Sequence, residues 1–82
     1  MKLYKTKNGK CNLAGAKIRL LRERAGLSQE QLAGVLQLAG LDLTQKTISR
    51  IETGERVIPD FELPYFADFF QTDISELLNS DL

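Results

Sequence analysis

The sequence predicts an all-α, compact five-helix domain, and three observations support this prediction. Apolar residues recur at spacings of three and four, as they do along one face of a helix. Residues that favour helix starts precede these runs, and glycine follows several of them. No segment shows the strict alternation of a half-buried strand. The length of 82 residues fits one small domain, which we expect to span residues 12–82 behind a flexible, basic N-terminal arm of residues 1–11. Because this segment contains Asn8-Gly9, a short turn is the alternative to a flexible arm.

The composition excludes several classes of protein. The sequence has no histidine and a single cysteine, Cys11, so zinc sites, internal disulfides and histidine-based catalysis are poor interpretations. No apolar run is long enough to span a bilayer, and the first residues lack the apolar segment of a secretory signal. We therefore expect a cytoplasmic binding protein that is not an enzyme and that uses no metal or cofactor.

The net charge of zero hides a gradient along the chain. Residues 1–24 contain eight basic residues and one acidic residue, whereas residues 57–82 contain six acidic residues and no basic one. One interpretation is a protein with one side facing a polyanion and the other side facing solvent. The other is that the charges only keep both ends of the chain soluble. Charge alone does not decide between them.

The first two helices are predicted from their apolar faces and their end signals. The first helix starts near Asn12, and Gly26 ends it in the left-handed conformation. Its apolar face consists of Ala14, Ile18, Leu21 and Ala25. The second helix starts at a capping box of Ser28 and Gln31 and ends before Gly40. Leu27 and Leu32 lie where a hydrophobic staple would hold this start.

The remaining helices are shorter. The third spans residues 44–53, with Thr44 as its N-cap, Ile48 and Ile51 toward the core and Gly54 after its end. The fourth spans about residues 61–70, with a proline near its first turn. The fifth runs to residue 78 from a second expected capping box, which Asp73 and Glu76 would form.

The helix of residues 44–53 carries the side chains with the most informative chemistry. At 100° per residue, the predicted inward side consists of Thr44, Thr47, Ile48 and Ile51, and the predicted outward side consists of Lys46, Ser49, Arg50 and Thr53. Gln45 projects from the first turn. Glutamine can pair with adenine, and arginine or lysine with guanine. Any surface helix has a polar outer face, but a short helix just before it is the arrangement that inserts a helix into DNA.

Residues 18–59 resemble the phage repressor and Cro type of helix-turn-helix, also called XRE-like. The matching stretches are IRLLRERAGLSQEQLA, then TQKTISRIETGER, with DISELL in the tail. The combination of GLSQxxLA and TISRIExG, in this order, makes the resemblance specific. One feature departs from the family pattern, because the segment from Leu36 to Thr44 is longer. We expect this insertion, LQLAGLDL, to lengthen the second helix by a turn.

The resemblance implies a role for individual residues. The implied base-contacting residues are Gln45, Lys46, Ser49 and Arg50. The implied contacts to the DNA backbone are Ser28, Gln29, Thr44, Thr47, Thr53 and Arg56. Glu52 would lie beside DNA phosphates, and the resemblance implies that Arg22 neutralises it in an ion pair.

We therefore expect a sequence-specific regulator of transcription, a repressor in the first instance, which binds double-stranded DNA as a homodimer. The expected dimer surface consists of Leu77, Leu78 and Leu82, with aromatic residues from the fourth helix. Two alternatives remain open. In the first, the protein binds DNA as the antitoxin of a toxin–antitoxin pair. In the second, it is a protein-interaction module that uses its acidic C-terminal half as the contact surface.

Overall fold

The computed structural model describes residues 5–79. The start of the expected arm and Leu82 of the expected dimer surface lie outside the described residues. The helices are α1 (Gly15–Arg24), α2 (Gln29–Leu38), α3 (Gln45–Thr53), α4 (Leu63–Phe70) and α5 (Ile74–Leu77), with a 3₁₀ turn η1 (Asp60–Glu62) before α4. The described residues contain no strand, so the predicted all-α, five-helix fold is confirmed. None of these helices has the length and apolar character needed to cross a membrane.

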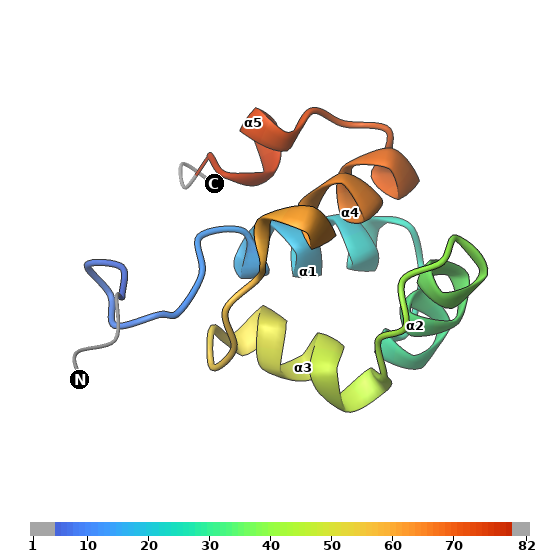
Figure 1. Ribbon diagram of the computed structural model, residues 1–82, viewed down its shortest axis with the longest axis horizontal. Coiled ribbons are helices and arrows are strands. Elements are labelled where there is room, and N and C mark those ends of the chain that lie inside the picture. The colour runs from blue at the N-terminus through green and yellow to red at the C-terminus, as the bar shows by residue number, and fades with distance from the viewer. Residues whose placement is uncertain (1–4, 80–82) are drawn as a thin grey trace.

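The helices are arranged around α1. In Figure 1, α3 lies along the lower edge, α4 and α5 along the upper edge, and α1 crosses between them. Helix α3 packs against both α1 and α2. Gly15, at the start of α1, lies directly against the carbonyl oxygen of Ile51, with no room for a Cβ atom. This close approach fixes the position of α3 on the rest of the domain.

The core contains side chains from all five α-helices. The largest fully buried side chains are Ile18, Leu32, Leu36, Ile48, Ile51, Phe66 and Leu77. Burying an aliphatic or phenyl side chain of this size contributes about 1.5–3 kcal/mol to stability. The prediction that Leu77 lies on a dimer surface is wrong, because the core of the domain covers it completely.

The predicted glycine ends of α1, α2 and α3 and the predicted start of α2 are confirmed. Gly26, Gly40 and Gly54 have positive φ angles of 73°, 105° and 83°. At the start of α2, the Ser28 hydroxyl accepts a hydrogen bond from the backbone N–H of Gln31, and the Gln31 side chain accepts one from the backbone N–H of Ser28. This is the predicted capping box.

Two other predicted helix starts are wrong. Helix α1 begins at Gly15, with Ala14 as its N-cap residue, and not near Asn12. Asn12 lies ahead of the helix, and its side chain accepts a hydrogen bond from the backbone N–H of Gly15. Asp73 and Glu76 form no capping box. The Asp73 side chain makes no cap hydrogen bond, and Glu76 forms an ion pair with Lys17 at 3.2 Å.

The start of α4 and the exposure of Ala25 also differ from the prediction. Residues 60–62 form the 3₁₀ turn, so α4 begins at Leu63 and not near residue 61. Ala25 is exposed because α1 ends at Arg24, and the polypeptide turns away from the core at this point.

The insertion between α2 and α3 does not lengthen α2 by a full turn. Helix α2 ends at Leu38, and the chain then turns at Gly40. Leu41 and Leu43 are buried in the core, which draws the chain out of the helix. The Gln37 side chain donates a hydrogen bond to the carbonyl oxygen of Leu43 and so holds the connection against α2. The insertion therefore forms an ordered connection that sets the direction of α3.

Residues 5–11 form the short turn, the second of the two expectations for this segment. They form a closed turn, in which the backbone N–H of Thr6 donates to the carbonyl oxygen of Lys10 at 2.8 Å and that of Gly9 donates to Thr6 at 2.9 Å. The backbone N–H of Cys11 donates to the carbonyl oxygen of Gly54, next to the end of α3. This turn is ordered because it donates hydrogen bonds to carbonyl groups at the end of α3, which have no partner within the helix.

Candidate nucleic-acid interface

One long side of α3 faces away from the core. Gln45, Lys46, Arg50 and Thr53 are exposed, whereas Thr47 and Ser49 are half-buried. Thr44 is also exposed, so its predicted inward position is wrong. As the N-cap, Thr44 lies ahead of the first helical turn in extended backbone conformation, where helical angles do not apply.

Lys46 and Arg50 are four residues apart, so they lie one turn apart on the exposed side of α3. Within residues 5–79, neither side chain forms a hydrogen bond or an ion pair. Both side chains are long and cationic, and together they can reach an anionic or hydrogen-bonding partner outside the protein.

A chain of hydrogen bonds connects the start of α3 to the interior. The Gln45 amide donates to the Gln29 side-chain oxygen at 2.7 Å, and the Gln29 amide donates to Glu52 at 3.0 Å. Because a carboxylate only accepts hydrogen bonds, Glu52 fixes which end of the Gln29 amide points inward. The side-chain oxygen of Gln45 and the second N–H of its amide then remain available to accept and donate hydrogen bonds to a partner outside the protein.

The inner end of this chain is a buried ion pair. Arg22 donates to both oxygens of Glu52, at 2.7 and 3.0 Å, and to the carbonyl oxygen of Leu27 at 2.7 Å. The side chains of Arg22 and Glu52 are only 11% and 2% exposed. The pair holds α1, α2 and α3 together and neutralises the Glu52 charge beneath the exposed side of α3.

The environment of Arg22 keeps this pair charged. Its hydrogen bond with Glu52 raises the pKa of Arg22 above its ordinary value, against the opposing effect of burial, and the negative charges of Glu52 and Glu23 add to the increase. A raised arginine pKa gives stability that is present below the unfolded pKa and is lost only as the pH rises through the folded pKa. The arginine contribution is therefore constant up to strongly alkaline pH.

The predicted backbone-contacting residues of α2 and α3 lie at the N-terminal ends of these helices. The hydroxyl oxygens of Ser28 and Thr44 accept hydrogen bonds from the backbone of Gln31 and Thr47, and the hydroxyls of Thr44 and Thr47 lie 3.0 Å apart. Helix N-termini carry partial positive charge, which favours an anion at this position.

The remaining two predicted backbone contacts have partners within the protein. Arg56 forms a two-point ion pair with Glu62, at 2.8 and 3.0 Å, and this hydrogen bonding raises the pKa of Arg56 against the effect of burial. The Thr53 hydroxyl donates to Glu55 or to the carbonyl oxygen of Arg50. Arg56 would have to share or leave its ion pair to bind a phosphate.

Sequence reasoning missed three residues that hold the C-terminal end of α3. Asn12 donates to the carbonyl oxygens of Ile51 and Arg56, at 3.0 and 2.7 Å. The Lys10 ammonium donates to the carbonyl oxygen of Thr53, and the backbone N–H of Cys11 donates to that of Gly54. These contacts join residues about 40 positions apart in the sequence. No local pattern indicates them; the only signal is that the last carbonyl groups of a helix need donors.

The comparisons with known proteins agree with this geometry. The chain matches the model of a family described as a helix-turn-helix domain, over residues 13–79. No curated protein and no solved structure matches the chain significantly. The matched range runs from just before α1 to just after α5, and so includes the complete exposed side of α3.

Proposed function

Because the chain belongs to the helix-turn-helix domain family, we propose that it is a sequence-specific regulator of transcription that binds double-stranded DNA with α3 in the major groove. The observation that carries the proposal is that Lys46 and Arg50, on the exposed side of a helix whose other side is core, have no hydrogen-bond or ion-pair partner among residues 5–79. The resemblance of residues 18–59 to phage repressors supports a repressor, which acts by occupying its DNA site.

Base contacts come from the exposed side of α3. The outward oxygen and N–H of the Gln45 amide match the donor and acceptor that adenine presents in the major groove. Lys46 and Arg50 supply donors for guanine. Ser49 is half-buried, and its side chain is short. It therefore contacts a base only where the backbone of α3 lies close to the floor of the groove.

Contacts to the DNA backbone set the position of α3 and carry no sequence information. The N-terminal end of α2, with Ser28 and Gln29, and that of α3, with Thr44 and Thr47, bind phosphates on the two sides of the groove. Gln29 links these contacts to base recognition, because it holds the amide of Gln45. Thr53 and Arg56 lie beyond the C-terminal end of the base-contacting residues and are secondary contacts.

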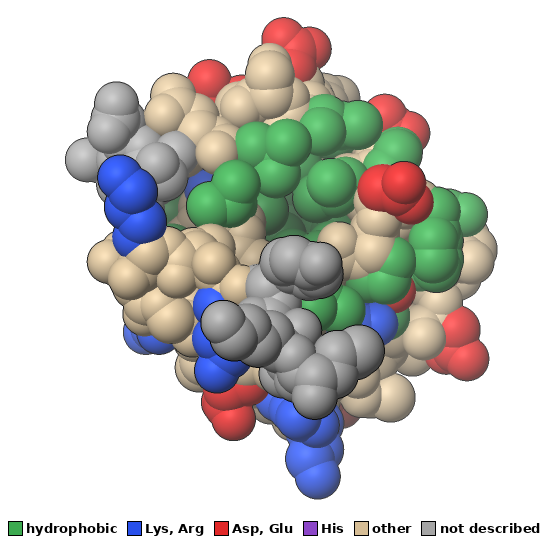
Figure 2. All heavy atoms as spheres, turned by 60° about the vertical axis from the view of Figure 1, so that its left-hand side comes forward, with side chains coloured by type: hydrophobic (Ala, Val, Ile, Leu, Met, Phe, Trp, Pro, Cys, Tyr) green, Lys and Arg blue, Asp and Glu red, His purple; other side chains and the backbone are tan. Residues whose placement is uncertain are grey.

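We propose a homodimer as the active form, because one recognition helix contacts only a few base pairs. Figure 2 shows hydrophobic side chains gathered on one face of the molecule. The exposed large hydrophobic residues of the described chain are Leu13, Leu38, Val57, Phe61, Phe69, Ile74 and Leu78. Several of them belong to η1, α4 and α5, so these elements supply a surface for a second copy.

Selection from a random duplex pool tests the proposal. We expect enrichment of short half-sites in inverted pairs, about one helical turn apart. The Arg50→Ala variant should cost about 1–3 kcal/mol on the selected duplex and relax the preference at one base pair. The matched control is Arg24→Ala, which removes an exposed arginine from α1, outside the proposed interface.

Three results would contradict the proposal in different ways. Weak binding without sequence preference at physiological salt would favour a protein-interaction module. If Arg50→Ala weakens selected and random duplexes equally, Arg50 contacts the backbone and not a base. If Arg24→Ala alters the preferred sequence as much as Arg50→Ala does, α3 is not the recognition element.

A further inference from the structure

The turn of residues 5–11 is attached to the C-terminal end of α3. The Lys10 ammonium donates to the carbonyl oxygen of Thr53 at 3.0 Å, and the backbone N–H of Cys11 donates to that of Gly54 at 2.8 Å. The aliphatic part of Lys10 also lies so close to Gly54 that a Cβ atom there would overlap with it. The turn therefore has a fixed position beside the proposed recognition helix.

This attachment changes the electrostatics of the helix end. The last carbonyl groups of a helix carry partial negative charge, which repels phosphate. Lys10 places a full positive charge against one of them, and Asn12 and Cys11 occupy two more. The C-terminal end of α3 thereby becomes compatible with a nearby anion.

The turn and α3 enclose a shallow cleft. It is lined on one side by Lys5, Asn8, Gly9, Lys10 and Cys11, and on the other by Arg50, Thr53, Gly54 and Glu55. Its charged groups are three cations and one carboxylate, that of Glu55, which accepts a hydrogen bond from Thr53. Because Arg50 borders the cleft, the cleft continues the exposed side of α3.

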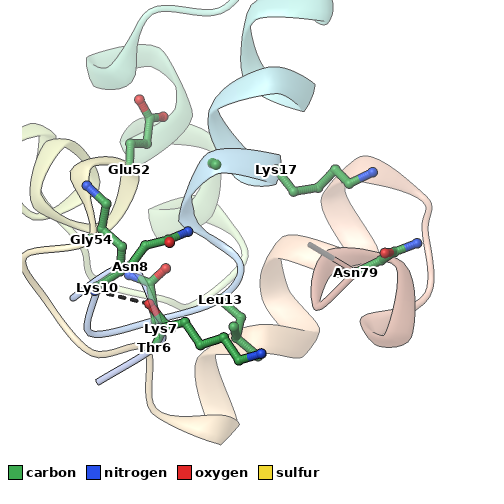
Figure 3. A pocket seen from close by; sticks show the side chains of 11 residues that line it. Thr6, Lys7, Asn8, Lys10, Leu13, Lys17, Glu52, Gly54 and Asn79 are labelled. Atoms are coloured by element: carbon green, nitrogen blue, oxygen red, sulfur yellow. Dashed lines mark hydrogen bonds between the residues drawn. The ribbon is translucent and has the colours of Figure 1, made fainter. Parts of the chain in front are cut away.

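The opposite side of the turn differs. Figure 3 shows that Lys10 extends toward Gly54, whereas Lys7 extends the other way, beside Leu13. The pocket on that side is also lined by Lys17 and Asn79, and Lys17 is already paired with Glu76. Lys5 and Lys7 are both exposed lysines of one turn, but only Lys5 lines the cleft beside α3.

We infer that the cleft between the turn and α3 binds a phosphate group of the DNA backbone, next to the groove that α3 occupies, with Lys5 and Lys10 as its cationic contacts. This inference rests on the proposed function and extends the DNA-binding surface beyond the helix pair. Because the turn is already ordered, binding does not carry the entropy cost of ordering it. The contact adds affinity and positions α3, but contributes no sequence preference.

The test compares Lys5→Gln with Lys7→Gln in the full chain. Each variant is titrated over a range of salt concentrations with two duplexes of about 20 base pairs, one selected and one of arbitrary sequence, long enough for two half-sites. For each protein copy bound, we expect Lys5→Gln to lower the salt slope by about 0.9 and to weaken binding to both duplexes about fivefold near 0.15 M salt, the effect of losing one phosphate contact per copy. Lys7→Gln should leave the slope and the affinity unchanged.

The outcomes separate this inference from the proposed function. If the unaltered protein binds neither duplex, both fail. If it binds, but Lys5→Gln keeps the full salt slope, the phosphate site is absent while the proposed function stands. If both variants lower the slope equally, the turn acts as a diffuse charge and the cleft is not a site. Circular dichroism checks that both variants fold. We expect that they do, because Lys5 and Lys7 are both exposed.

Discussion

At the scale of single residues, Arg22 and Glu52 connect the packing of the helices with the orientation of side chains on the exposed side of α3. Arg22 neutralises Glu52, and Glu52 in turn orients Gln29 and, through it, Gln45. The sequence predicted the ion pair only through the family resemblance, because the partners are 30 positions apart. It did not predict the two glutamines as a continuation of the pair, since side-chain amides have no spacing rule across helices.

Removing one partner of this pair should be more costly than removing both. Arg22→Met or Glu52→Met alone leaves a buried charge without its partner, and each should lower the free energy of unfolding by about 3 kcal/mol or more. The double variant should cost clearly less than the sum. Urea unfolding of the four proteins gives the coupling free energy. The exposed pair Arg19–Glu23 is the control, with an expected coupling of about 0–1 kcal/mol.

Additive effects of Arg22→Met and Glu52→Met would contradict this view, since they would mean that the two side chains contribute independently. A coupling no larger than that of Arg19–Glu23 would likewise show that burial does not strengthen the pair.

At the scale of elements, the predictions succeeded where the determining residues are neighbours in the chain. The capping box of α2 and the left-handed glycines depend on residues three or four positions apart. The second expected capping box failed because Lys17, 59 positions away, attracts the Glu76 carboxylate. The attachment of the turn of residues 5–11 to α3 was not predicted for the same reason, because its partners lie more than 40 positions away in the chain.

Gly54 should be less replaceable than Gly26, although both have left-handed backbone conformations. An alanine at Gly26 would meet no atom within 4 Å, so Gly26→Ala should cost only the backbone strain, about 1–2 kcal/mol. Gly54→Ala adds an overlap with Lys10 and should cost at least about 1 kcal/mol more. Thermal unfolding of the two variants measures the difference, and equal losses would show that Lys10 moves aside freely.

At the scale of the whole molecule, basic and acidic side chains are distributed over different parts of the structure. The cations Lys5, Lys10 and Arg50 meet around the cleft beside α3, whereas the segment from η1 to α5 contains only acidic charged residues. The charge gradient of the sequence anticipated this division. It did not identify the buried residues of the acidic half, because a leucine in a short helix can face either side.

A homodimer should form through the surface of η1, α4 and α5. Phe61 is 65% exposed, so Phe61→Gln should leave the fold intact and weaken dimerisation. Sedimentation with a selected duplex should give two protein chains per duplex for the unaltered protein and one for Phe61→Gln at the same concentration. Leu38→Gln is the control, because Leu38 is exposed at the end of α2. A monomer that binds every selected duplex as a one-to-one complex would contradict the dimer.

The lack of internal partners for Lys46 and Arg50 has an evolutionary consequence. Substitutions at these positions remove no hydrogen bond or ion pair within the described chain, and the core side of α3 is formed by other residues. Under the proposed function, duplicated copies of the gene can therefore diverge toward new DNA sites by single substitutions at these positions, without passing through an unstable intermediate. Position 45 is more constrained, because a change there also releases Gln29. Divergence of recognition should begin at positions 46 and 50 and reach position 45 later.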